Sequence, residues 1–187
     1  MMFYNFLIIL LLSPVQKEKC DIFKEKDYWL SKSREALVCS MMPIVDEQAE
    51  KNNLDPDLIL ALINVESNWD RKIVSSANAC GLTQVIPKYT GKITKKYTCA
   101  QLKNPRTSIV AGTKILRWWI NWHTENQPKK KYTEEEILKR ALCSYNAGFR
   151  CGPTRSPIRG GMRYAKKVLE QKQKIKRDYN ELVNSLK

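Results

Sequence analysis

Histidine, glycine and closely spaced cysteine pairs are scarce or missing in this chain of 187 residues. It has a single histidine, His123, and seven glycines, and no two cysteines show the C-x-x-C spacing. With a single histidine and no C-x-x-C pair, the chain lacks the usual ligand pattern of a zinc site, so we expect neither a metal nor a cofactor. The low glycine content, with many Leu, Ile, Lys and Glu residues, favours a mainly α fold. We find no convincing strand alternation and no internal repeat.

Acidic residues are also few, because 19 Asp and Glu face 33 Lys and Arg, and the formal net charge is +14 with a pI near 9.6. Such a positive chain is typical of proteins with a polyanionic neighbour: nucleic acid, an anionic membrane surface or a charged cell wall. The charge by itself does not choose among these partners.

No apolar run is long enough to cross a bilayer as a helix. The longest candidate, residues 3–12, is interrupted by Tyr4 and Asn5 and resembles the apolar part of a secretory signal. It lacks a preceding Lys or Arg and a clear small-x-small cleavage site. We expect residues 1–19 to be a signal-like leader and the protein to be exported to the periplasm or secreted; an uncleaved anchor or a buried helix are the alternatives.

The cysteines are consistent with export. There are six of them: Cys20, Cys39, Cys80, Cys99, Cys143 and Cys151. An even number suggests disulfides formed in an oxidising compartment, whereas free buried thiols in a reducing cell are the other possibility. Sequence does not select among the fifteen complete pairings. Pairing of nearest neighbours is the simplest of them.

The order of expected elements suggests one compact domain with extensions. Residues 20–42 read as a charged helical extension, Pro43 as the start of the next helix, and residues 171–187 as a basic C-terminal helix. Further helices are expected at 55–66, near 84–90, at 109–122 after a Ser108 cap, from Thr133 to Tyr145, and from about Tyr164. The stretch 68–106 has little periodicity, and loops of that length are usually functional.

Glu66 is the residue that most suggests chemistry. Together with Ile59, Leu62 and Ile63 it falls on one face of the predicted helix 55–66, and that face should be buried. An apolar setting and the negative end of the helix dipole both disfavour a carboxylate, so the pKa of Glu66 should be raised. A carboxyl group that keeps its proton near neutral pH can serve as a general acid.

A second carboxylate is hard to find. Between Glu66 and Glu125 the only other one is Asp70, while ten Lys and Arg lie in that interval. Most glycosidases place two carboxylates across the bond that they cleave. If the chain acts on sugars, the substrate itself would have to supply the missing group.

Three ordered blocks of sequence resemble the lytic transglycosylases of the soluble-lytic-transglycosylase type, and the resemblance covers about residues 43–170. The blocks are Glu66-Ser67-Asn68-Trp69 with Ser75, Ala77 and Gly81 to Pro87; Asn104-Pro105 with Ile109, Ala111, Gly112 and Leu116; and Ala141 to Gly148, with Tyr164 and Val168 closing the pattern. Departures are Thr83, where the family usually has Met, Asn78 in place of a glycine, and cysteines at 80 and 143.

The resemblance implies a lysozyme-like helical domain whose long loop region forms a substrate cleft. It also implies cleavage of the β-1,4 bond between N-acetylmuramic acid and N-acetylglucosamine in peptidoglycan, with a 1,6-anhydromuramoyl end as product. Glu66 would act as acid and then as base, assisted by the acetamido group of the substrate.

Further roles carry over by position. Ser75 and Gln84 would bind the sugar, Tyr145 and Asn146 would line the cleft, and Tyr164 would orient Glu66. Ser67 would support the turn. The partners implied are peptidoglycan glycan strands, with an envelope-spanning secretion complex or a virion as a possible setting; no nucleic acid is expected, and the protein should be a monomer.

A cluster of aromatic residues in the helix 109–122 suggests a second sugar contact. Trp119 follows the core spacing of Ile115 and Leu116, whereas Trp118 and Trp122 could form a separate exposed pair. His123, at the end of the helix, is expected on the surface.

Other functions fit parts of the same pattern. A goose-type lysozyme would share the fold but deliver water, with Asp70 as the only nearby base. A non-catalytic basic binding module, or a pseudoenzyme within an envelope-spanning machine, would not need Glu66.

Overall fold

The protein is a mainly helical molecule in the computed structural model, which describes residues 12–26, 28–127, 131–152 and 157–186. Its helices are α2 (Pro14–Glu25), α3 (Lys32–Asn52), α4 (Pro56–Ser67), α5 (Pro87–Thr90), α6 (Cys99–Leu102), α7 (Pro105–Glu125), α8 (Glu134–Ala147), the 3-10 helix η1 (Gly148–Cys151) and α9 (Arg159–Ser185). Extended pairing among the described residues is limited to isolated bridges from Cys80 to Val74 and to Val85. The predicted mainly α class is confirmed.

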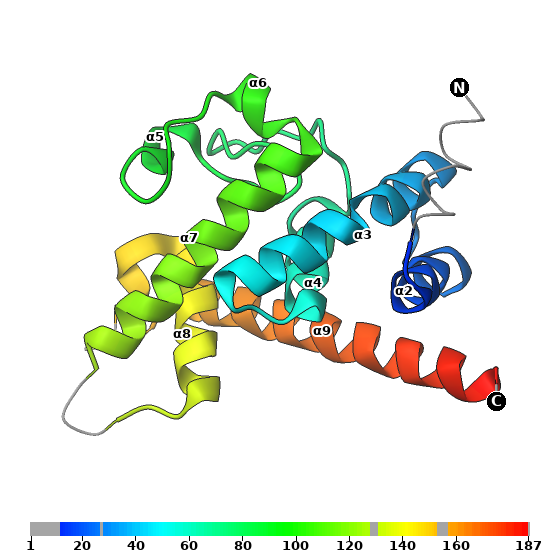
Figure 1. Ribbon diagram of the computed structural model, residues 1–187. Coiled ribbons are helices and arrows are strands. Elements are labelled where there is room, and N and C mark those ends of the chain that lie inside the picture. The colour runs from blue at the N-terminus through cyan, green and yellow to red at the C-terminus, as the bar shows by residue number, and fades with distance from the viewer. Residues whose placement is uncertain (1–11, 27, 128–130, 153–156, 187) are drawn as a thin grey trace.

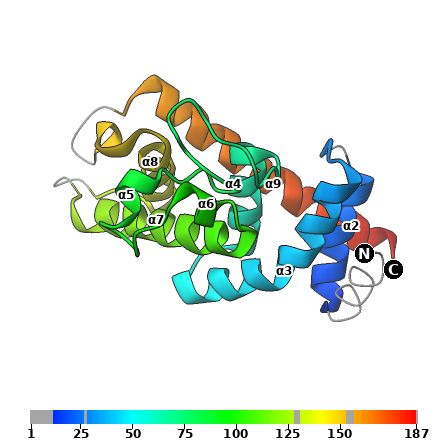
Figure 2. The ribbon, with the colours of Figure 1, turned by 90° about the horizontal axis from the view of Figure 1, so that it is seen from above.

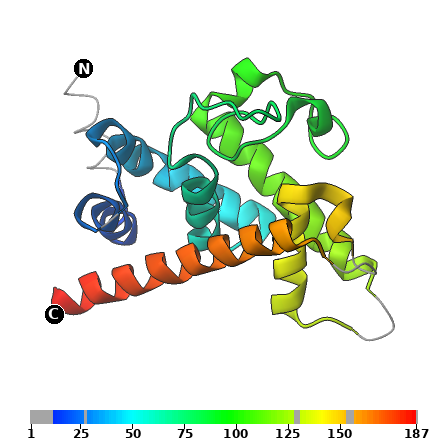
Figure 3. The same ribbon diagram turned by 180° about the vertical axis from the view of Figure 1, so that it is seen from behind.

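Helix α4 lies at the centre, and its residues 58–63 are all buried. It packs against α3 and α9, and α9 continues along one side of the molecule past α8 and α2 (Figures 1 and 3). The segment between α4 and α7, which includes α5 and α6, gathers at the opposite side of the molecule from α9. Seen from above, α2 and the start of α3 stand to one side of α4, α7 and α8 (Figure 2).

The starts of the helices follow their capping residues. Asp55 caps α4 by accepting from the amide of Asp57 at 2.9 Å, and Thr133 forms a capping box with Glu136 at the start of α8, as predicted. The predicted start of α7 was wrong. Asn104 caps this helix and Pro105 takes its first position, so Ser108 lies inside the helix, where it is buried.

Pro43 does not open a helix, contrary to the prediction. It lies inside the 21-residue helix α3, on an exposed face, although proline removes a backbone hydrogen bond there. Side chains on both sides of Pro43 are buried, Val38 and Met42 before it and Val45 and Ala49 after it. This packing holds the helix together across the interruption, since tertiary contacts contribute more to helix stability than propensity does.

The last helix begins at Arg159 and not at about Tyr164, and it runs for 27 residues. Its apolar stripe packs on the domain, with Val168 and Ile175 fully buried. Farther along, Asp178 accepts hydrogen bonds from Tyr28 at 2.8 Å and from Lys174 at 2.6 Å. This buried group ties α9 to the connection between α2 and α3.

Three disulfides join nearest neighbours in sequence: Cys20 to Cys39, Cys80 to Cys99 and Cys143 to Cys151. The simplest of the possible pairings is therefore confirmed. The first links α2 to α3, the second links the long connection to α6, and the third links α8 to η1. Two of the bridges thus hold a short or irregular segment, the long connection in one case and η1 in the other, against a helix.

Most of the predicted leader, residues 1–11, lies outside the described residues. Within the part of the chain that is described, no helix combines the length and the apolar character needed to cross a membrane. Residues 14–19 belong to α2, which Ser13 caps through its bond with Gln16.

Candidate active site

Glu66 lies in the last turn of α4, where the buried helix comes to the edge of the core. The helix ends at Asn68, whose backbone is in the left-handed conformation and whose amide donates to the carbonyl of Asn64 at 2.9 Å. Ser67 is buried and its hydroxyl donates to the carbonyl of Ile63 at 3.1 Å, which supports the helix end. These contacts fix the direction in which the Glu66 side chain leaves the helix.

The hydroxyl of Tyr164, on α9, donates to Oε1 of Glu66 at 2.5 Å. Burial raises the pKa of Glu66 from 4.5 to about 7, and the hydrogen bond from Tyr164 opposes part of that rise. The raised pKa predicted from the helix pattern agrees with this environment. At neutral pH, Glu66 is thus protonated in a large fraction of the protein molecules and can donate that proton.

Tyr145, on α8, stands beside this pair. Burial, followed by the nearby charge of Glu66, raises the pKa values of Tyr145 and Tyr164 well above 10. Both phenols therefore stay protonated and act as hydrogen-bond donors. The Tyr145 hydroxyl donates to the carbonyl of Thr83 at 2.7 Å, and this bond joins α8 to the loop between α4 and α7.

The loop between α4 and α7 is fixed to α7 by Thr83, which is fully buried. Its amide donates to Oγ of Ser108 at 3.1 Å, and its hydroxyl donates to the Ser108 carbonyl at 2.7 Å. Gly81 and Gly112 permit this close approach, because a Cβ on Gly81 would lie 1.9 Å from the carbonyl oxygen of Leu102 and one on Gly112 would lie 2.5 Å from the Thr83 side chain. The threonine at the family's methionine position thus serves the scaffold.

Ser75 and Gln84 belong to the same loop, but neither has a described contact with Glu66. Oγ of Ser75 accepts from the amide of Ala79 at 3.1 Å. The Gln84 side chain donates to the carbonyls of Gly81 at 2.9 Å and Ile73 at 3.3 Å. Among the described residues of the loop, none accepts the Ser75 hydroxyl proton and none donates to Oε1 of Gln84, so each group keeps hydrogen-bonding capacity. Asn146 is exposed directly after Tyr145.

The structure therefore brings Glu66, Tyr145 and Tyr164 together and leaves Ser75, Gln84 and Asn146 as nearby polar groups on the loop and on the end of α8. Sequence reasoning missed the bonds between Thr83 and Ser108. The cap-and-proline pair Asn104-Pro105 was the signal that could have placed Ser108 inside the helix.

His123 was predicted on the surface, and that prediction was wrong. It is fully buried, and Nε2 lies 2.9 Å from the Ser144 hydroxyl. Burial, with the charge of Arg140, lowers the pKa of His123 to about 4, so the ring is neutral at pH 7. Position at a helix end does not imply exposure here because α8 packs along α7.

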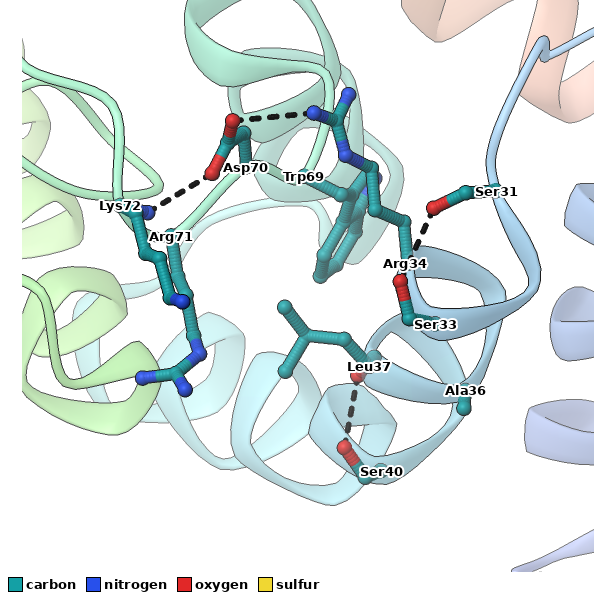
Figure 4. A pocket seen from close by; sticks show the side chains of 10 residues that line it. All are labelled: Ser31, Ser33, Arg34, Ala36, Leu37, Ser40, Trp69, Asp70, Arg71 and Lys72. Carbon is teal, nitrogen blue, oxygen red and sulfur yellow. Dashed lines mark hydrogen bonds and ion pairs between the residues drawn. The ribbon is translucent and has the colours of Figure 1, made fainter.

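A hollow of about 720 Å³ opens next to the turn that follows Glu66, between that turn and the start of α3 (Figure 4). Trp69 and Leu37 form its apolar wall, and Arg34 donates to Asp70 at 3.0 Å across it. Glu66, Tyr145 and Tyr164 are not among the residues that line this hollow. Asp70, the only other carboxylate between Glu66 and Glu125 in the sequence, thus takes part in a different set of contacts.

Comparison with known proteins agrees with this geometry. The model of the family described as "Transglycosylase SLT domain" matches residues 43–169, about two thirds of the chain. The chain belongs to this family. The matched region begins inside α3 and ends in α9. It therefore includes Glu66, the loop between α4 and α7, Tyr145 and Tyr164.

Curated relatives carry the name "Membrane-bound lytic murein transglycosylase C". The protein from Actinobacillus pleuropneumoniae serotype 5b (strain L20) is 31% identical over 117 residues, which is 57% of this chain and 30% of the relative. The protein from Haemophilus influenzae (strain PittEE) is 31% identical over 115 residues, 57% of this chain and 31% of the relative. This chain thus spans under a third of the length of these relatives.

One similar solved structure is an inactive variant of the lytic transglycosylase Slt from Pseudomonas aeruginosa. It superposes with a TM-score of 0.60 at 19% sequence identity, over 86% of this chain and 28% of that one. At this identity the likeness concerns the fold, and the predicted lysozyme-like helical fold is confirmed.

Proposed function

We propose that this SLT domain cleaves the β-1,4 bond between N-acetylmuramic acid and N-acetylglucosamine in peptidoglycan and leaves a 1,6-anhydromuramoyl end. Family membership and the names of the relatives support this activity and this substrate. The observation that carries the proposal is the Glu66 carboxyl, with its pKa near 7 and its 2.5 Å hydrogen bond from Tyr164.

In the first step Glu66 would donate its proton to the glycosidic oxygen while the bond to the anomeric carbon breaks. The acetamido oxygen of the muramoyl residue would stabilise the positive anomeric carbon, in the place of a second carboxylate. Glu66 would then be a carboxylate next to the muramoyl O6 hydroxyl. As O6 attacks the anomeric carbon, Glu66 would take its proton and return to its starting state.

The scarcity of carboxylates favours this route over hydrolysis. Asp70 forms an ion pair with Arg34 and accepts from the amide of Lys72, and neither bond involves the Glu66 group. A goose-type lysozyme would need a base that activates water against the sugar. No contact among the described residues places Asp70 in that role.

Supporting residues would hold the substrate and the acid in register. Tyr164 would position Glu66, and Tyr145 would fix the loop through the Thr83 carbonyl. Ser75, Gln84 and Asn146 would bind the sugar beside the scissile bond with the hydrogen-bonding groups that their present contacts leave available. The long loop between α4 and α7 would form one side of the cleft.

Digestion of purified peptidoglycan by the wild-type protein and by Glu66→Gln, read by mass spectrometry, tests the activity. The expected product is an anhydro end, one water lighter than a hydrolysed end, and Glu66→Gln should give none. Hydrolysed ends that disappear in Asp70→Asn would replace the proposal with a lysozyme. Equal function of Glu66→Gln would indicate a binding module.

We also propose export to the cell envelope. Three disulfides and the signal-like leader support an oxidising compartment outside the cytoplasm. A monomeric protein acting on glycan strands, in an envelope-spanning secretion complex or a virion, would fit the net charge of +14. Fractionation of cells that express the full chain, with the state of the cysteines read after alkylation, tests this placement.

A further inference from the structure

Phe149 is an apolar side chain with 60% of its surface exposed, on η1 directly after α8. Its ring makes edge contacts with three tryptophans of α7. The centroid distances are 6.2 Å to Trp118, 5.2 Å to Trp122 and 5.0 Å to Trp119, with interplanar angles of 89°, 82° and 70°. These contacts give the exposed ring a defined orientation.

Trp119 lies in the core as the helical spacing predicted, but Trp118 and Trp122 do not form an exposed pair, because both pack partly against the core. Trp119 is 6% exposed and belongs to the core, whereas Trp118 and Trp122 are half-buried and stack on each other at 6.4 Å with an angle of 10°. We call Phe149, Trp118 and Trp122 the aromatic patch. The exposed ring of Phe149 and the accessible parts of the two tryptophans thus form one apolar surface, of the kind that binding sites use.

The aromatic patch adjoins the candidate active site along the chain. Tyr145 and the exposed Asn146 end α8, and Phe149 follows three residues later. Between them Gly148 has a φ of +63°, and a Cβ placed on it meets no atom within 4 Å. Gly148 therefore borders open space, and the disulfide from Cys143 to Cys151 holds the segment against α8.

We propose that the aromatic patch binds a sugar ring of the same glycan strand whose bond is cleaved at Glu66, at a position farther along the strand. This inference rests on the proposed function. One face of a pyranose carries mainly C–H groups. These groups pack on the negative face of an aromatic ring, and the contact removes apolar surface from water. A patch that extends the site would bind long strands more tightly than short ones.

The test measures binding of the N-acetylglucosamine hexamer by calorimetry in a Glu66→Gln background, which prevents turnover. Phe149→Ala should weaken binding about fivefold, the loss that one aromatic contact typically gives. Phe149→Tyr should bind like the parent, and Phe149→Leu, which keeps apolar area without a ring, should resemble Phe149→Ala. The matched control is Trp29→Ala, which removes an aromatic side chain that is 86% exposed in the connection between α2 and α3.

Equal affinity in Phe149→Ala and in the parent would overturn the proposal, as would absence of binding by the parent both to the hexamer and to sedimented peptidoglycan. Two other results with Phe149→Ala, each without a change in sugar affinity, would also overturn the proposal. Loss of binding to anionic lipid vesicles would assign the aromatic patch to a membrane, and a changed sedimentation coefficient would assign it to a second copy of the chain. Digestion of peptidoglycan by the wild type is scored separately, so failure of the proposed activity is distinguishable.

Discussion

Glu66 differs from an ordinary surface glutamate because its carboxyl group is shielded from water while one phenol donates to it. Its pKa is about 7 instead of the ordinary 4.5, so the folded protein binds more protons than the unfolded chain between these pH values. Stability from this group is therefore present below pH 4.5 and is lost as the pH rises through 7. The same proton is the one that the proposed reaction uses.

Replacing Glu66 with Gln should abolish cleavage of peptidoglycan and stabilise the protein at alkaline pH. The amide has no charge to desolvate, so at pH 8 it removes a penalty on the order of 3 kcal/mol at most for a shift of this size, from 4.5 to about 7. Denaturant unfolding at pH 5 and pH 8 checks this prediction. Identical pH dependence of the two proteins would contradict the buried, protonated state of Glu66.

Tyr164→Phe should lower kcat and also move the alkaline limb of the activity profile to higher pH. The phenol stabilises the carboxylate, so its loss should raise the pKa of Glu66 above about 7. A rate profile from pH 5 to 9 separates the two effects. A lower kcat with an unmoved limb would mean that Tyr164 acts on packing alone; Tyr179→Phe, also on α9, is the control.

The grouping of the candidate site residues was more predictable than the contacts that hold the scaffold. Glu66, Tyr145 and Tyr164 were found because the helix pattern and the family blocks both mark them, and the structure places them together. The buried positions of Thr83 and His123 were not predicted, because each depends on a hydrogen-bond partner far away in sequence. Thr83 pairs with Ser108, and His123 pairs with Ser144. A buried polar group needs such a partner, and local pattern does not reveal it.

At the scale of the elements, cap residues predicted helix starts where they were read together with the residue that follows. Asp55-Pro56 and Thr133 placed α4 and α8, and the same reasoning applied to Asn104-Pro105 would have placed α7. Pro43 misled because a proline at a helix start and one inside a well-packed helix look alike in sequence. The difference depends on tertiary packing.

The contact between the loop and α7 should be sensitive to a single methyl group. Gly112→Ala would put a Cβ 2.5 Å from Thr83 and displace it from Ser108, at a cost of about 1–3 kcal/mol typical of overpacking. Because Tyr145 holds the Thr83 carbonyl, activity should fall as well. Thermal unfolding and peptidoglycan digestion measure both effects.

A double variant makes this prediction sharper. Thr83→Gly removes the three side-chain atoms that the new Cβ would meet, so Gly112→Ala should cost less in the Thr83→Gly background than in the wild type. Gly160→Ala is the control, because a Cβ there has no neighbour within 4 Å. Additive losses in the double variant would show that the close approach of Gly112 to Thr83 does not limit stability.

At the scale of the whole molecule, the disulfides secure three separate parts of the fold, and their losses should differ. The first two bridges each span 19 residues and the third spans 8. Loop-closure entropy gives about 3 kcal/mol for each of the longer bridges and about 2.5 kcal/mol for the shorter one. These similar losses of stability should have dissimilar effects on function.

Replacing Cys80 and Cys99 with Ser should reduce activity more than replacing Cys20 and Cys39, although the two changes should destabilise the protein alike. The bridge from Cys80 fastens the loop that carries Thr83 and Gln84, whereas the bridge from Cys20 joins α2 to α3 and does not hold that loop. Urea unfolding gives the stability of each pair variant, and digestion rates are compared at a temperature where both remain folded. Equal activity of the two folded variants would mean that the loop keeps its position without the bridge, through Thr83, Ser108 and Tyr145 alone.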